Sequence, residues 1–99
     1  MQRHELTEAR MLRAVVLYET GHTLADWQVA KRTRAALEAS RIFAYLTRKL
    51  IPAVPLAQIA QLAVWSEDSA RLAIKAAARS ETTRLTADAI ASKMMEHTR

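Results

Sequence analysis

The chain has 99 residues but no cysteine, one glycine and two prolines. Without cysteine it can form neither a disulfide framework nor a thiolate metal site, and this absence is typical of a reducing compartment. With a single glycine it cannot form a glycine-rich phosphate loop. Alanine is abundant and β-branched residues are few, so the composition favours an all-α fold. The length is that of one domain, and we expect residues 1–99 to form it.

The chain also lacks a long uninterrupted apolar run. Its most apolar region, residues 50–65, is broken by two prolines and two glutamines, so we do not expect it to cross a bilayer. The first ten residues, "MQRHELTEAR", are charged and lack the apolar core of a signal peptide. These features predict a cytoplasmic protein without a membrane partner.

Residue patterns that support catalysis are missing as well. His4, His22 and His97 are widely separated, and none has metal-ligand spacing with an acid or a second histidine. Glu67 and Asp68 are adjacent, so on a helix they point in different directions and make a poor acid–base pair. No serine lies in a recognisable nucleophile elbow. We therefore predict no catalytic residue, no metal site and no cofactor, and we expect that the chain is not an enzyme.

Positive charge is concentrated in one segment. The net charge is +5, and residues 27–66 contain six basic residues against one acid, Glu38, so this segment supplies the whole excess. A local block of charge indicates a polyanionic partner, although a solvated helix face would look the same. The five aromatic residues mostly sit at core spacing and offer no stacking platform for RNA. The six basic residues are Lys31, Arg32, Arg34, Arg41, Arg48 and Lys49.

Apolar spacing and capping residues predict about five to six helices. Gly21 is expected to end the first, Ser66 to cap the helix that starts at Glu67, and Thr86 to cap the last. Thr23 and Asp26 form a capping-box pattern around a short turn. The expected elements cover residues 5–19, the turn after Thr23, residues 35–50, a short helix from Pro55, residues 67–79 and residues 86–96.

The helix over residues 35–50 is expected to be central, with one apolar and one basic face. Arg34, Arg41 and Arg48 are seven residues apart, which is nearly two turns, so they line up away from the core. Glu38 is placed to pair with the first two of these arginines. The apolar residues at helical spacing, expected to face the core, are Ala39, Ile42, Phe43, Leu46 and Leu50.

Two short helices about a bend, preceded by this helix, indicate a helix-turn-helix at about residues 55–79. "LADW", "KRTR", "EASRIFAYLTRKL" and "VPLAQIAQLA" follow one another in an order that resembles the C-terminal DNA-binding domain of DnaA, the bacterial replication initiator. The resemblance covers about residues 5–79. It implies a small Trp-repressor-like helical domain that binds double-stranded DNA.

In that family a basic loop and the start of the long helix hold phosphates and reach the minor groove; by resemblance these residues are Lys31, Arg32, Arg34 and Arg41. The family's base-reading signature, "RDHTTV", falls on residues 66–71 without a gap, where only Glu67 and Ser69 are similar. A slip of one residue would instead place Asp68 under the signature aspartate and Arg71 among the reading positions, and both registers stay open. The predicted major-groove set is Ser66, Glu67, Asp68, Ser69, Arg71 and Lys75.

These observations favour a stand-alone bacterial or phage regulator of transcription or replication that is associated with the nucleoid. We expect its binding of double-stranded DNA to be tolerant of sequence or altered in sequence specificity. No ATPase motif occurs, so no nucleotide partner is expected. The alternative is a helical module that kept the fold and binds a protein, for which an exposed Trp65 would be an anchor. We expect instead that Trp65 fills the core where the family has glycine, and that Trp27 packs beneath the first helix.

Overall fold

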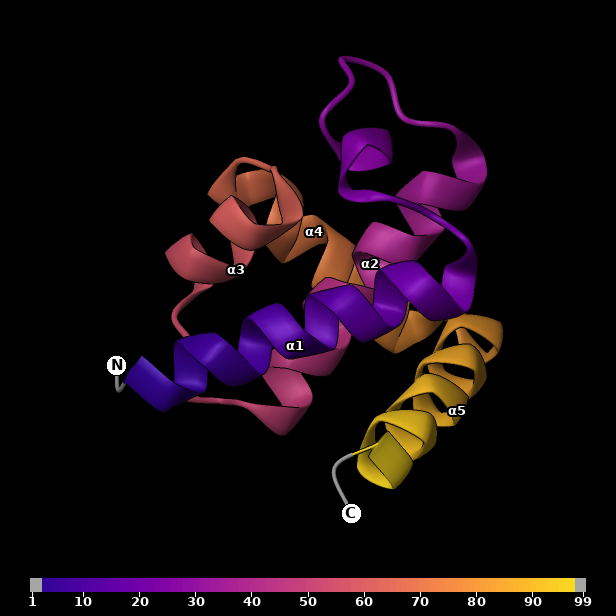
Figure 1. The fold of residues 1–99 in the computed structure, drawn as a ribbon. Helices are drawn as coiled ribbons and strands as arrows, with labels where there is room; N and C mark the ends of the chain where they lie inside the picture. The colour runs from indigo at the N-terminus through magenta and orange to yellow at the C-terminus, as the bar shows by residue number, and fades with distance from the viewer. Residues whose placement is uncertain (1–2, 98–99) are drawn as a thin grey trace.

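The computed structural model describes residues 3–97 and confirms the all-α prediction: the described chain consists of five α-helices and one 3₁₀ turn (Figure 1). None of these helices has the length and apolar character needed to span a membrane. The elements are α1 (Arg3–Thr20), η1 (Leu24–Trp27), α2 (Arg34–Leu50), α3 (Leu56–Ala63), α4 (Glu67–Arg79) and α5 (Glu81–His97).

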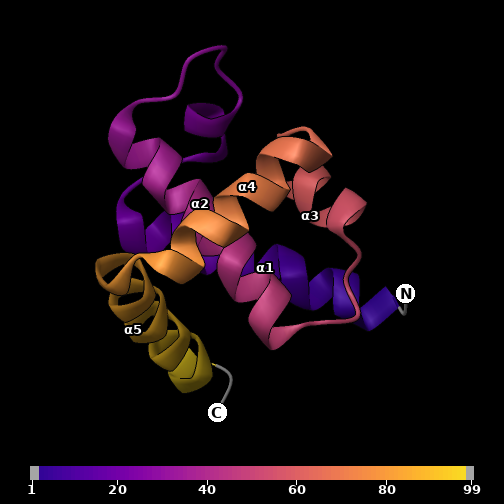
Figure 2. The same ribbon diagram turned by 180° about the vertical axis from the view of Figure 1, so that it is seen from behind.

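Helix α2 is the centre of the fold and contacts every other element. Figures 1 and 2 show α1 on one side of α2 and α4 on the opposite side. Ile42, Phe43 and Leu46 are fully buried, as their spacing predicts. Two buried hydroxyls on the same helix, those of Ser40 and Thr47, donate hydrogen bonds to backbone carbonyls one turn earlier, so no polar group is stranded there.

The turn before α2 also follows the sequence. The backbone N–H of Thr23 donates to the Asp26 carboxylate at 2.9 Å, which confirms the capping-box prediction. Trp27 is buried, and its ring centroid lies 5.7 Å from that of Phe43 in a tilted arrangement. The short turn therefore anchors the chain to α2 just before the basic segment.

Two predictions at helix ends are wrong. Helix α5 begins at Glu81 rather than near Thr86, because the Ser80 hydroxyl caps it by accepting the Thr83 N–H at 3.2 Å. No glycine or proline separates Ser80 from Thr86, so nothing delays the helix. Leu50, expected in the core, is 46 % exposed, and its neighbour Ile51 is buried where the chain turns out of α2.

Helices α3 and α4 form a compact helix-turn-helix. Val64 closes α3 in the left-handed conformation, with φ 57° and ψ 52°, a position that usually favours glycine. The N–H of Trp65 then donates to the Ala60 carbonyl at 2.8 Å. The Ser66 hydroxyl accepts the Ser69 N–H at 3.2 Å, which confirms Ser66 as the cap of α4.

Candidate nucleic-acid interface

Helix α4 is open to solvent along its length. Its buried residues are small, namely Ala70, Ala73 and Ala77, and the partly buried Ile74 packs against the core beside them. In Figure 2, α4 lies in front of α2 and no other helix covers it. Residues three and four apart share a helix face, and α4 exposes two such stripes. The outer stripe is Asp68, Arg71 and Lys75, and the groove stripe is Ser69, Leu72, Ala76 and Arg79.

A groove of about 490 Å³ runs between α2 and the groove stripe; we call it the α2–α4 groove. A second groove of about 450 Å³ lies against the basic loop, residues 28–33. Both grooves are lined by Leu37 and Trp65, so they adjoin one another. The basic loop, the turn of the helix-turn-helix and α4 therefore form one continuous surface.

The predicted phosphate-binding residues are distributed over this surface, with one exception described below. Lys31 lines the groove at the basic loop, Arg41 lines the α2–α4 groove, and Arg34 is exposed at the first position of α2. Within residues 3–97, four exposed cations here form no ion pair; we call them the unpaired cations, and they are Lys31, Arg34, Lys75 and Arg79.

Arg32 is the exception, because its guanidinium is engaged inside the protein. It donates to the Ser40 hydroxyl at 2.9 Å, to the Ala63 carbonyl at 2.8 Å and to the Val64 carbonyl. It also lies 4.7 Å from the centre of the Trp65 ring, a cation–π contact. Burial lowers the pKa of Arg32. Arg32 thus ties the basic loop to the turn between α3 and α4.

A second arginine, which sequence reasoning missed, holds the same turn from α1. Arg13 donates to the Leu62 carbonyl at 3.0 Å. Its pKa is lowered by burial and, to a lesser extent, by repulsion from Arg10. Cations at the C-terminal end of a helix donate hydrogen bonds to its last carbonyls, and they interact favourably with the negative end of the helix dipole. The last turn of α3 is therefore fixed by two arginines, which hold α4 in place.

Trp65 lies between the two sequence-based expectations. It is partly buried and packs against the core, yet it also lines both grooves. Arg32 covers part of its ring from the loop side. The indole therefore joins the core to the exposed surface.

The first turn of α4 is largely occupied with its own contacts. The hydroxyls of Ser66 and Ser69 are hydrogen-bonded to each other at 3.0 Å. Arg71 donates to Asp68 at 2.7 Å, and both side chains are well exposed. Glu67 is exposed beside them. A base contact from Nη1 of Arg71 or Oδ1 of Asp68 requires this exposed ion pair to open.

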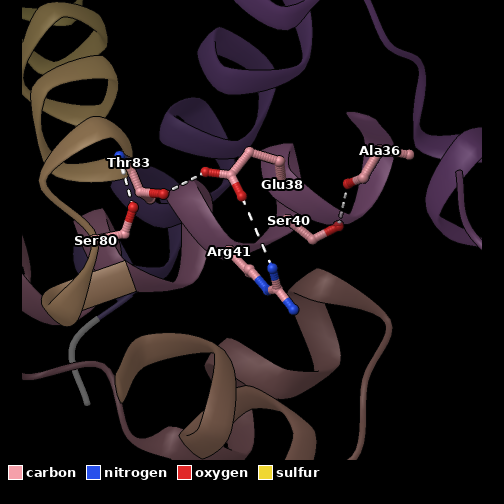
Figure 3. Close-up of polar contacts among 6 residues, drawn as sticks. All are labelled: Ala36, Glu38, Ser40, Arg41, Ser80 and Thr83. Atoms are coloured by element: carbon pink, nitrogen blue, oxygen red, sulfur yellow. Dashed lines mark hydrogen bonds and ion pairs between the residues drawn. The ribbon is translucent and has the colours of Figure 1, made fainter. Parts of the chain in front are cut away.

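Arg41 pairs with Glu38, whose carboxylate also accepts a hydrogen bond from α5. Figure 3 shows Glu38 between Thr83 of α5 and Arg41, with one carboxylate oxygen turned towards each. The Thr83 hydroxyl donates to Glu38 at 2.5 Å, while the Arg41 guanidinium is 3.9 Å from the other oxygen. Glu38 therefore partly compensates the charge of Arg41.

The described histidines and acids do not assemble a metal site. His4 lies 3.9 Å from Glu5, and the ring of His22 is hydrogen-bonded to the Thr20 hydroxyl at 3.2 Å. No group of three potential ligands gathers within residues 3–97. The side chain of His97 lies outside the described part.

Comparison of the chain with protein-family models, with curated proteins and with solved structures gave no match. The resemblance to the DNA-binding domain of DnaA accordingly stays a prediction from the sequence.

Proposed function

We propose that the chain binds double-stranded DNA and acts as a bacterial or phage regulator of transcription or replication at the nucleoid. The observation that supports this most is the set of unpaired cations around an uncovered second helix of a helix-turn-helix. Such cations release counterions when they neutralise phosphates, and this release drives sequence-independent affinity. No carboxylate within the described chain already neutralises them.

In this proposal α4 enters the major groove with its outer stripe, and the basic loop follows the backbone. Arg71 would read guanine once it leaves Asp68, and the carboxylate could accept from cytosine. Glu67 and Asp68 also repel nearby phosphates, so phosphate contacts rather than base contacts dominate the affinity. Arg32 and Arg13 act from inside, because they hold the turn that sets the angle of α4.

The proposal is tested by fluorescence anisotropy with a labelled duplex of mixed sequence. Four phosphate contacts predict that affinity falls roughly 100-fold between about 50 and 200 mM salt. Absence of binding at the lower salt concentration, or affinity that does not depend on salt, would reject the proposal. A random-site selection then measures how much sequence preference α4 contributes.

Two double charge-reversal variants distinguish the effect of where the cations lie from the effect of the net charge. R34E with K75E removes two unpaired cations, whereas R3E with R10E makes the same charge change on α1. We expect the first pair to weaken all duplexes at least tenfold, and the second pair to weaken them less than about threefold. Equal losses would show that overall charge, and not this surface, governs binding.

A further inference from the structure

The α2–α4 groove has an apolar lining that phosphate binding does not explain. Leu72 is 66 % exposed on the groove stripe, and Leu37 of α2 and Trp65 of the turn before α4 also line the groove. A large exposed apolar side chain beside an aromatic ring in a groove is typical of an interaction surface. Phosphate groups offer no matching apolar surface. The remaining apolar lining consists of Ala73 and Ala76.

The charge of the groove indicates the chemistry of its occupant. Arg41, Lys75 and Arg79 line it, and among the described residues no carboxylate does. Glu38 of α2 accepts a hydrogen bond from Thr83 and partly compensates Arg41, so Lys75 and Arg79 supply the uncompensated charge of the groove. An apolar floor with cations alone along it is complementary to a segment that combines apolar side chains with carboxylates.

The dimensions of the groove suit a short helix. From Ser69 to Arg79 its α4 wall rises about 15 Å at 1.5 Å per residue, which is roughly the length of a ten-residue helix. Two helices, α2 and α4, form its walls, as in sites where an amphipathic helix lies in a groove. The anchors of such a helix recur every three or four residues, which matches the spacing along α4.

We infer that the α2–α4 groove binds an acidic amphipathic segment of a protein partner. Leucine-type or aromatic side chains of the segment contact Leu72, Leu37 and Trp65, and its carboxylates pair with the cations along the groove. The groove shares Arg41, Lys75 and Arg79 with the surface proposed for DNA. The inference does not rest on DNA binding, because it depends on the apolar lining of the groove, which phosphate binding does not need.

The test is a selection of random 16-residue peptides displayed on phage against the full chain, followed by measurement of the enriched peptides on the variant L72S. L85S is the matched control, since Leu85 on α5 is 63 % exposed and the chemical change is identical. Both sites are exposed, so we expect both variants to keep the melting temperature of the parent.

We expect the enriched peptides to carry net negative charge and apolar residues at helical spacing. Measured singly by anisotropy, they should bind L72S about tenfold more weakly than the parent and L85S with unchanged affinity. Enrichment of basic or neutral peptides, equal binding to L72S, or no enrichment at all would overturn the inference.

Duplex titrations of the same proteins keep this result separate from the proposed function. L72S retains every cation, so its affinity for DNA should stay within about twofold of the parent. Peptide binding without DNA binding would reject the proposed function alone. DNA binding without peptide selection would reject the groove inference alone.

Discussion

The two sides of α2 use charge differently. Helices α1 and α5 together carry five Lys or Arg residues and six Asp or Glu residues, whereas residues 28–50 carry six and one. Lys49 of this segment nevertheless belongs with the first side, because it pairs with Asp88 of α5. On the first side Lys93 of α5 reaches Glu19 of α1 at 2.9 Å, and this hydrogen bond raises the pKa of Lys93. On the side of α4 the unpaired cations have no such partner.

This contrast separates charges that join helices from charges that face outwards. Exposed ion pairs contribute little to stability, so leaving cations unpaired costs the fold little. It does keep them available for a polyanion. The chain therefore keeps unpaired cations where α4 is uncovered, and nearly balances charge where α1 and α5 meet.

The largest effect we expect comes from the one cation of the basic loop that faces inwards. R32A removes hydrogen bonds to Ser40, Ala63 and Val64 and leaves their acceptors at a partly buried site. We expect a loss of about 2–3 kcal/mol in the free energy of unfolding, equivalent to a melting temperature lower by roughly 10 °C or more. Urea denaturation measures the first quantity and calorimetry the second.

The matched substitution is R34A, two residues later on the exposed start of α2. It should change stability by less than about 0.5 kcal/mol, because its side chain holds nothing within the described protein. If both variants melt alike, Arg32 is one more surface cation and the division between inward and outward charges does not hold in the basic loop.

The second largest effect we expect is a gain in the free energy of unfolding from a substitution in the turn between α3 and α4. Val64 is a β-branched residue with φ 57°, and the left-handed conformation costs such a residue about 1–2 kcal/mol. V64G removes this cost but gives the unfolded chain more freedom, so we expect a net stabilisation of up to about 1 kcal/mol. Because no charge changes, affinity for DNA should stay the same; a weaker duplex complex would show that Val64 itself contacts the partner.

The elements on both sides of α2 could be predicted because their signals are local. Ser66 followed by two acids marked the start of α4 at Glu67, and Gly21 marked the end of α1 at Thr20. Ser80 offered an equally local signal for α5 and was overlooked in favour of Thr86. Leu50 followed the helical period, but burial there was decided by the turn that brings Ile51 inwards.

The sequence predicted which basic residues belong to the candidate site, but not which distant groups their side chains bond to. The basic segment identified Lys31 and Arg41 as surface cations, and both line the grooves. Arg32 has the same residue type and neighbourhood, yet it bonds to a carbonyl 31 residues away, and Arg13 bonds to one 49 residues away. Charge along the sequence cannot distinguish an arginine that closes a distant helix from one that faces solvent.

The third prediction concerns removal of the negative charge next to Arg41, which increases the net positive charge near α4. E38Q removes the carboxylate next to Arg41 and keeps an amide oxygen that can accept from Thr83. We expect duplex affinity to rise about fivefold at low salt, since Arg41 is then fully available to phosphate. The control E8Q makes the same charge change on α1 and should alter affinity less than twofold; a similar rise in both would mean that only net charge matters.

The smallest effect compares two single lysines on the two sides. Lys75 belongs to the unpaired cations on α4, whereas Lys49, at the end of α2, lies 3.4 Å from Asp88 of α5. K75Q should weaken duplex binding about threefold and reduce the salt slope by about one, because one phosphate contact is lost. K49Q loses the same charge but should leave both quantities unchanged, since Asp88 already compensates it. Anisotropy titrations over a series of salt concentrations measure the salt slope of each variant. An equal reduction of the slope in K75Q and K49Q would mean that Lys49 contacts DNA despite its ion pair with Asp88.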